Sequence, residues 1–116
     1  MNHKDLDVWK AAMDLAETVY QLTKAFPKEE IYGITSQIRR AVVSVPSNIS
    51  EGAARSSPKE MHHFLEYAIG SLAELETQLI LAKRLSYFSE STVFDQINTT
   101  RALTLGLRKS LRNRMA

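Results

Sequence analysis

The sequence contains no cysteine and only four glycines and three prolines among its 116 residues. Without cysteine it can form neither disulfides nor thiolate metal sites, and the lack suits a reducing compartment. Scarce glycine and proline favour an all-helical chain. No stretch approaches the ~20 apolar residues that span a bilayer, and charged residues interrupt the N-terminal segment, so no signal peptide is predicted. We therefore expect a cytoplasmic protein with no membrane partner.

The sequence has no large excess of either charge, since its net charge is +2. The charges are, however, unevenly distributed along the chain. Residues 1–30 carry four lysines against six acidic residues. From residue 101 onward there are five basic residues and no acidic one: Arg101, Arg108, Lys109, Arg112 and Arg114. Such a cluster can mark an anionic partner, or it can complement the negative C-terminal end of a helix dipole.

Apolar residues recur at helical spacing in four segments, over about residues 5–25, 33–54, 57–85 and 91–112. The connections between these segments are short, and short loops in bundles join antiparallel neighbours. We therefore predict an all-α chain that forms a single domain, residues 1–116, folded as an antiparallel up-down-up-down four-helix bundle.

Each predicted helix has an apolar face that we expect to be buried. In the first helix these positions are Leu6, Trp9, Met13, Ala16, Val19, Tyr20 and Leu22. In the fourth they are Val93, Ile97, Leu103, Leu107 and Leu111, with Leu105 off the stripe. Pro46 interrupts the second helix and crowds the carbonyl of Val42. Because apolar spacing continues to Ile49, we predict a kinked but continuous helix.

The third helix has the clearest pattern. Ser57, Pro58 and Glu60 form a capping box with proline at the first helical position. The apolar seam then repeats every 3.5 residues: Met61, Leu65, Ala68, Leu72, Leu75, Leu79 and Ala82. Further apolar residues beside this seam indicate more than one packing partner. At about 43 Å, part of this helix is expected to project beyond the bundle or to pack against another subunit.

No catalytic, cofactor or metal site is predicted. Glu60 and His63 match half of a di-iron motif, but no second half exists. His62 and Glu66 fit a surface pair better than an acid–base pair. There is no phosphate loop and no nucleophile elbow. Two further features favour structural roles. Glu74 and Glu76 are expected to lie at a solvated edge of the helix, and the alternative is that one of them points inward and pairs with an arginine. Gly70 and Gly106 suggest close contacts between helices.

Three segments carry a family resemblance: residues 5–10 (DLDVWK), residues 32–52 (YGITSQIRRAVVSVPSNISEG) and residues 64–79 (FLEYAIGSLAELETQL). They resemble the four-helix-bundle family encoded in intervening sequences of 23S ribosomal RNA genes, to which the accessory protein of diversity-generating retroelements is related. The resemblance implies a homopentameric ring, no enzymatic activity, and nucleic-acid binding. Its signature can also be structural: Pro46 shapes the second helix, Asn48 and Glu51 tie it to neighbours, and Gly52 ends it.

Two functions are therefore expected as alternatives. The first is an oligomer that binds RNA or DNA, its phosphates met by Arg39, Arg40, Arg55, Arg101, Arg108, Lys109, Arg112 and Arg114. A ring would repeat each patch and add avidity. The second is a protein-interaction or scaffold module, favoured by the surplus apolar surface and the near-neutral charge. In that case the arginines near the C-terminus cap the last helix or pair with acidic residues.

Overall fold

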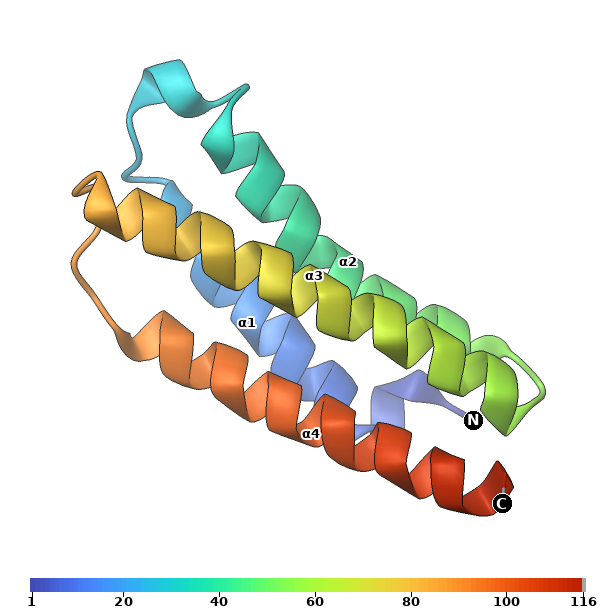
Figure 1. The fold of residues 1–116 in the computed structure, drawn as a ribbon. Coiled ribbons are helices and arrows are strands. Elements are labelled where there is room, and N and C mark those ends of the chain that lie inside the picture. The colour runs from blue at the N-terminus through green and yellow to red at the C-terminus, as the bar shows by residue number, and fades with distance from the viewer. Residues whose placement is uncertain (116) are drawn as a thin grey trace.

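Four helices lie side by side in the structure, a computed structural model that describes residues 1–115 (Figure 1). The helices are α1 (Asp7–Thr23), α2 (Ile34–Ala54), α3 (Pro58–Arg84) and α4 (Thr92–Met115), with short 3₁₀ turns η1 (His3–Asp5) and η2 (Lys28–Glu30). Each helix packs against its neighbours in sequence, and α1 also packs against α4. The predicted all-α, up-down-up-down four-helix bundle is confirmed.

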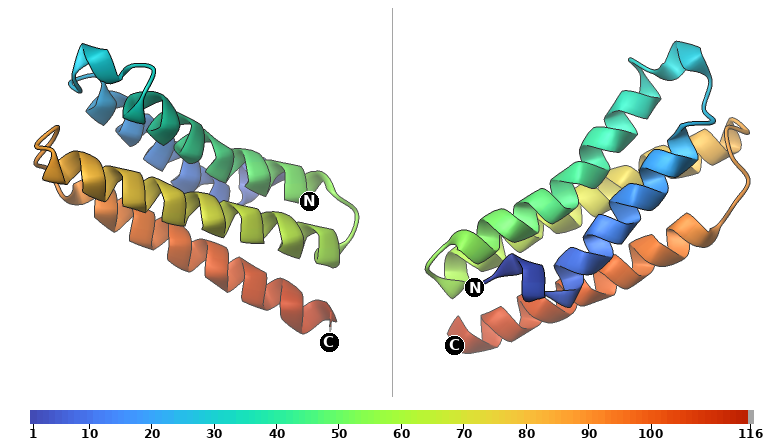
Figure 2. Two further views of the ribbon diagram at one scale, coloured as in Figure 1. Left: turned by 45° about the horizontal axis from the view of Figure 1, so that its top comes forward. Right: turned by 180° about the vertical axis from the view of Figure 1, so that it is seen from behind.

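The two ends of the bundle differ in what they hold. The N-terminus, the turn between α2 and α3, and the C-terminal end of α4 gather at one end, and the other two connections lie at the opposite end (Figures 1 and 2). With 27 residues α3 is about 40 Å long, against 47 Å for the long axis of the molecule. Its buried residues run from Met61 to Ala82, so α3 does not project beyond the bundle, and its packing against another subunit stays a prediction.

The predicted seam of α3 is confirmed at all seven positions, each of which is buried. Ser57 Oγ accepts a hydrogen bond from the Glu60 N–H at 3.1 Å, as expected for an N-cap. The helix ends at Arg84, and Ser86, two residues later, has a φ of 64° in the left-handed region. The N–H of Tyr87 then reaches back to the carbonyl of Ala82 at 3.0 Å. This is a Schellman termination with serine in the place that glycine usually fills.

The predicted core face of α1 is partly wrong. Met13 and Tyr20 are 37% and 40% exposed. Of the rest of the predicted set, Val19 is fully buried, and four residues are partly buried and pack against the core: Leu6, Trp9, Ala16 and Leu22. The buried positions on α1 are Val8, Ala12, Leu15, Val19 and Thr23. Helix α1 therefore has two apolar stripes, and the one with smaller side chains faces the core. The stripe that contains Met13 and Tyr20 lies at the surface.

The core face of α4 includes two threonines that the apolar pattern does not predict. Thr100 and Thr104 are buried, whereas Leu103 is 38% exposed. Their hydroxyls donate to the carbonyls four residues earlier, at 2.8 and 2.7 Å. A buried hydroxyl is tolerated when it is hydrogen-bonded, so the two threonines continue the heptad seam of Val93 and Ile97.

Helix α2 continues through Pro46, as predicted. Asn48 and Glu51 do not tie α2 to another helix of the bundle, because Asn48 donates to the Ser44 carbonyl of α2 and Glu51 pairs with Arg55, the residue that follows α2. Gly52 does not end the helix either, since α2 runs on to Ala54. The contact to α3 is made instead by Ser44, whose hydroxyl bonds that of Ser71. Pro46 therefore lies in an unbroken helix that packs against both α1 and α3.

Among residues 1–115, no helix is both long and apolar enough to cross a membrane.

Candidate interaction surface

Arg101 pairs with an acidic residue of the neighbouring helix. Its Nη2 lies 2.9 Å from Glu76 Oε1 of α3, and its Nη1 donates to Asn98 Oδ1 at 3.0 Å. Both charged side chains are about one-third exposed or less. Residues beside a heptad seam commonly form such interhelical pairs. Glu76 is thus the inward carboxylate, and its pairing holds the Arg101 guanidinium against α3.

Arg112 also lies against α3. Its Nη2 is 3.5 Å from His62 Nε2, and His62 Nδ1 is 3.1 Å from Glu66 Oε1. The predicted pair of His62 and Glu66 is therefore present, and only about one-sixth of the His62 side chain is exposed. Of the remaining predicted residues on α4, Arg108 is half-buried and Lys109 is exposed. The basic side chains of α4 thus divide between the seam with α3 and solvent.

Arg55 and Arg114 meet at one end of the bundle. Both line a small hollow between the end of α2, the start of α3 and the end of α4. The Arg55 guanidinium is 3.3 Å from Glu51 Oε1 and lies 5.0 Å from the centre of the Phe64 ring. Arg114 is exposed. This is the place where the structure brings predicted basic residues from two different helices together.

Arg39 and Arg40 lie at the opposite end, in a groove between α1 and α2 that we call the Arg39 groove. It is lined by Tyr20, Ile31, Tyr32, Thr35, Ser36, Arg39, Arg40, Val43, Ser44 and Ser47. Four large apolar or aromatic side chains that line the groove are exposed: Tyr32 is 96% exposed, and Ile31, Val43 and Tyr20 are each at least 40% exposed. Clustered exposed apolar side chains mark interaction sites.

The Arg39 guanidinium is fixed in place by two contacts from α1. Its Nε donates to Thr23 Oγ1 at 2.9 Å, and its Cζ lies 4.7 Å from the centre of the Tyr20 ring. The buried Thr23 hydroxyl in turn donates to the Val19 carbonyl at 2.8 Å. Within residues 1–115, neither Arg39 nor Arg40 pairs with a carboxylate. Arg39 therefore holds two guanidinium nitrogens ready for an external acceptor.

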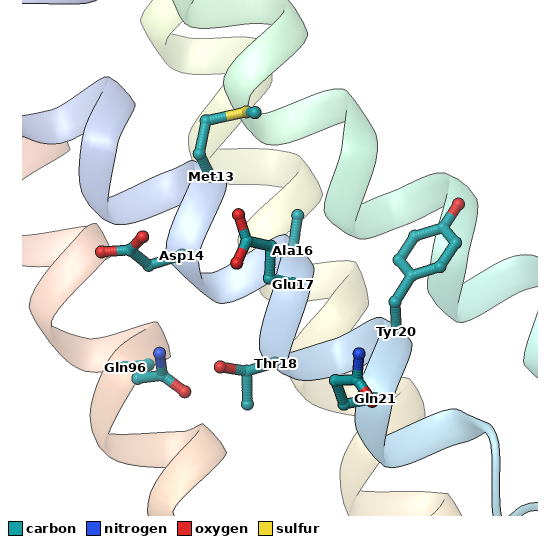
Figure 3. A pocket seen from close by; sticks show the side chains of 8 residues that line it. All are labelled: Met13, Asp14, Ala16, Glu17, Thr18, Tyr20, Gln21 and Gln96. Atoms are coloured by element: carbon teal, nitrogen blue, oxygen red, sulfur yellow. The ribbon is translucent and has the colours of Figure 1, made fainter.

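A second surface lies on the other flank of α1, and we call it the Asp14–Glu17 surface. It is lined by Met13, Asp14, Ala16, Glu17, Thr18, Tyr20, Gln21 and Gln96. Figure 3 shows Tyr20 reaching toward α2, Asp14 on the side of α4, and Glu17 between them. Within the part of the chain that the structure describes, Asp14 and Glu17 have no ion-pair partner. Helix α1 thus separates unpaired acidic side chains from unpaired basic ones.

The remaining candidates for chemistry make local contacts. His63 shares a 2.8 Å hydrogen bond with Tyr67, and Glu60 Oε2 accepts a hydrogen bond from the hydroxyl of the N-cap Ser57 at 3.3 Å. Among residues 1–115, no group of three or more acidic or histidine side chains could hold a metal ion. At the loop end of the bundle, Tyr87 Oη donates to Glu30 Oε2 at 2.7 Å, and this hydrogen bond to the carboxylate is the main cause that raises the pKa of Tyr87 above 10.0.

Gly70 and Gly106 do not make the close helix contacts that were expected. A Cβ added at either position would meet nothing within 4 Å. Gly52 does make such a contact, because a Cβ there would lie 2.9 Å from Phe64 Cβ. The tight approach of α2 and α3 therefore depends on Gly52, and the other two glycines lie on open surface.

Sequence patterns named Arg39 and Arg40 but missed the residues that make their surroundings distinctive. The apolar pattern predicts that Tyr20 lies in the core, and it indicates no role for Thr23, Asp14 and Glu17. The usable signal was the double stripe of α1, since a helix with two apolar faces has more than one partner.

Comparison with known proteins gives one family match. No curated protein matches the sequence. The family model described as 23S rRNA-intervening sequence protein matches residues 4–108. That span includes α1, α2, α3 and most of α4. Since the match covers nearly the whole chain, the chain belongs to the 23S rRNA-intervening sequence protein family.

Proposed function

We propose that the protein is a non-enzymatic binding protein whose first partner is another copy of itself. The observation that carries the proposal is the exposed apolar surface along the Arg39 groove, where Tyr32, Ile31 and Val43 surround two arginines. Tyrosine and arginine are enriched at the centres of protein interfaces. A cytoplasmic location and the absence of a cofactor belong to the same proposal.

The assembly that the family resemblance implies is a homopentamer, and we adopt it for this chain. Light scattering coupled to gel filtration tests it directly, at protein concentrations from 1 to 100 μM, a range of about 100-fold that separates tight from weak association. A mass several times 13.1 kDa supports assembly. A mass of one chain across the range contradicts it.

Nucleic-acid binding is the second candidate function. It is supported by Arg55 and Arg114, which line one hollow, and by three basic residues on the same half of α4: Arg108, Lys109 and Arg112. Repetition of this basic end around a ring would multiply a weak contact into measurable avidity. RNA and DNA are both included, because phosphate contacts carry no base information.

A gel-shift panel with RNA, single-stranded DNA and duplex DNA over a salt series tests the second candidate. Binding that weakens as salt rises supports it, since phosphate contacts release counterions. No shift with any probe at low salt contradicts it and leaves a protein-interaction or scaffold role.

A further inference from the structure

We infer that neighbouring copies meet through α1, with the Asp14–Glu17 surface of one copy seated on the Arg39 groove of the next. This inference rests on the proposed self-association and names the two surfaces that would make it. The two surfaces lie on opposite flanks of α1 and share Tyr20. Their charges are complementary, since one carries Asp14 and Glu17 and the other Arg39 and Arg40.

The charged groups on both surfaces lack ion-pair partners within residues 1–115. No carboxylate of residues 1–115 pairs with Arg39 or Arg40, and no basic group of those residues pairs with Asp14 or Glu17. By contrast, Arg101 and Arg55 each have an acidic partner within the chain. A carboxylate is therefore the acceptor that the groove lacks, and the next copy supplies one.

Arg39 is prepared for such an acceptor. The hydrogen bond from its Nε to Thr23 and its contact with the Tyr20 ring fix the plane of the guanidinium. A fixed guanidinium loses little conformational entropy when a carboxylate binds. Arg40, the next residue, is exposed and lines the same groove. The two arginines together offer more than one position to an incoming carboxylate.

The acidic and basic groups also lie at similar heights along the bundle. Tyr20 contacts Arg39 directly, and Glu17 precedes Tyr20 by three residues, or about 4.5 Å along the helix axis. Copies with parallel axes can therefore bring Glu17 of one against Arg40 of the next. Because the two surfaces differ, the contact is heterologous, and repetition closes into a ring when the rotation returns to the first copy.

A protein partner fits this groove better than a nucleic acid does. The groove combines two arginines with exposed Tyr20, Ile31, Tyr32 and Val43, whereas surfaces that bind nucleic acid are strongly basic. The unpaired acidic residues across α1 would repel a phosphate backbone. On a second copy of the chain, the same acidic residues become the complementary groups, and Met13 and Tyr20 supply apolar area at the contact.

Charge reversal followed by charge restoration tests the inference. Arg40→Glu and Glu17→Lys should each reduce the mass measured by light scattering toward that of one chain. Each variant should still be helical and should unfold cooperatively on heating, which shows that the single chain remains folded. The double variant Arg40→Glu/Glu17→Lys restores opposite charges at every contact of the ring, and should recover the parent mass. Lys59→Glu, an exchange of an exposed cation on α3, serves as the matched control and should leave the mass unchanged.

Each other outcome overturns a defined part of the account. An oligomeric parent whose mass does not respond to Arg40→Glu overturns the proposed contact and leaves self-association intact. Loss of assembly in both single variants without recovery in the double variant overturns the pairing of Glu17 with Arg40. A parent that is one chain at every concentration overturns the proposed self-association together with this contact.

Discussion

Gly52 of α2 lies so close to Phe64 of α3 that a Cβ at Gly52 would stand 2.9 Å from the Phe64 Cβ. We expect Gly52→Ala to destabilise the protein by about 1–3 kcal/mol, because overpacking forces the two helices apart. Gly70→Ala is the matched control. It adds the same methyl group at a helix position with open space, and should stabilise the monomer by up to about 1 kcal/mol. Urea unfolding of both variants measures the contrast, and equal effects would contradict the packing role of Gly52.

Ser86 should gain stability on replacement by glycine. It occupies the left-handed conformation at the end of α3, which costs an L-residue roughly 1–2 kcal/mol. We expect Ser86→Gly to raise the free energy of unfolding by about 1 kcal/mol. Ser89→Gly, in the same loop but without a positive φ, should give no gain. A destabilised Ser86→Gly variant would show that the serine side chain is needed there.

Thr23 should matter for assembly more than for folding. Thr23→Val removes the acceptor that fixes Arg39 Nε and keeps the volume of the buried side chain. Arg39 is not fully buried, so its freed N–H can bind water, and the change in unfolding free energy should stay near 1 kcal/mol. The dissociation constant of the oligomer, measured by sedimentation, should rise several-fold. An unchanged dissociation constant would show that a fixed Arg39 is not required.

Substitutions of the arginines on α4 should show which of them bind nucleic acid and which stabilise the bundle. Replacing Arg108 and Arg112 together by glutamine should weaken nucleic-acid binding for all sequences. It should also reduce the slope of log affinity against log salt by about 1.8 for duplex DNA or about 1.4 for single strands. Arg101→Gln is the control, because Arg101 pairs with Glu76. It should lower stability by up to about 1 kcal/mol and leave affinity unchanged.

If the double variant folds properly and keeps the parent affinity and salt slope, these two arginines do not form the binding site. A loss of stability or a change of oligomer size in that variant would instead assign them to the seam with α3, where Arg112 lies beside His62.

Tyr87 should make stability depend on alkaline pH. Its hydroxyl donates to Glu30, so its pKa in the folded state is above the unfolded value of about 10. The unfolded chain then loses this proton first, and the stabilisation is complete below pH 10 and lost as pH rises through the folded pKa. Above pH 10, the free energy of unfolding of Tyr87→Phe should fall less steeply with pH than that of the parent. Parallel stability curves for the two proteins would contradict this assignment.

The bundle was predictable from sequence where one apolar stripe dominates a helix. The seam of α3 repeats without interruption, and all seven of its residues are buried. On α1 two stripes compete, and the larger side chains of Met13 and Tyr20 point outward while Ala12 and Leu15 are buried. On α4 an apolar pattern does not predict the buried Thr100 and Thr104, because their burial depends on hydrogen bonds within the helix.

The surfaces were less predictable because charge in sequence does not reveal pairing in space. Arg101 was expected at a phosphate, but its partner Glu76 is 25 residues away in the chain. Nothing in the sequence distinguishes Arg39 from any other arginine on a helix surface, because the Thr23 hydroxyl that holds it lies 16 residues away in the chain. A sequence shows which groups carry charge, and the packing of helices decides which of them remain unpaired.

The mass of the protein in solution tests the central claim most directly. Sedimentation velocity and light scattering should give one stable species of about five times 13.1 kDa at micromolar concentration, and Arg40→Glu should shift it toward a single chain. A parent protein that stays at 13.1 kDa throughout would contradict the account.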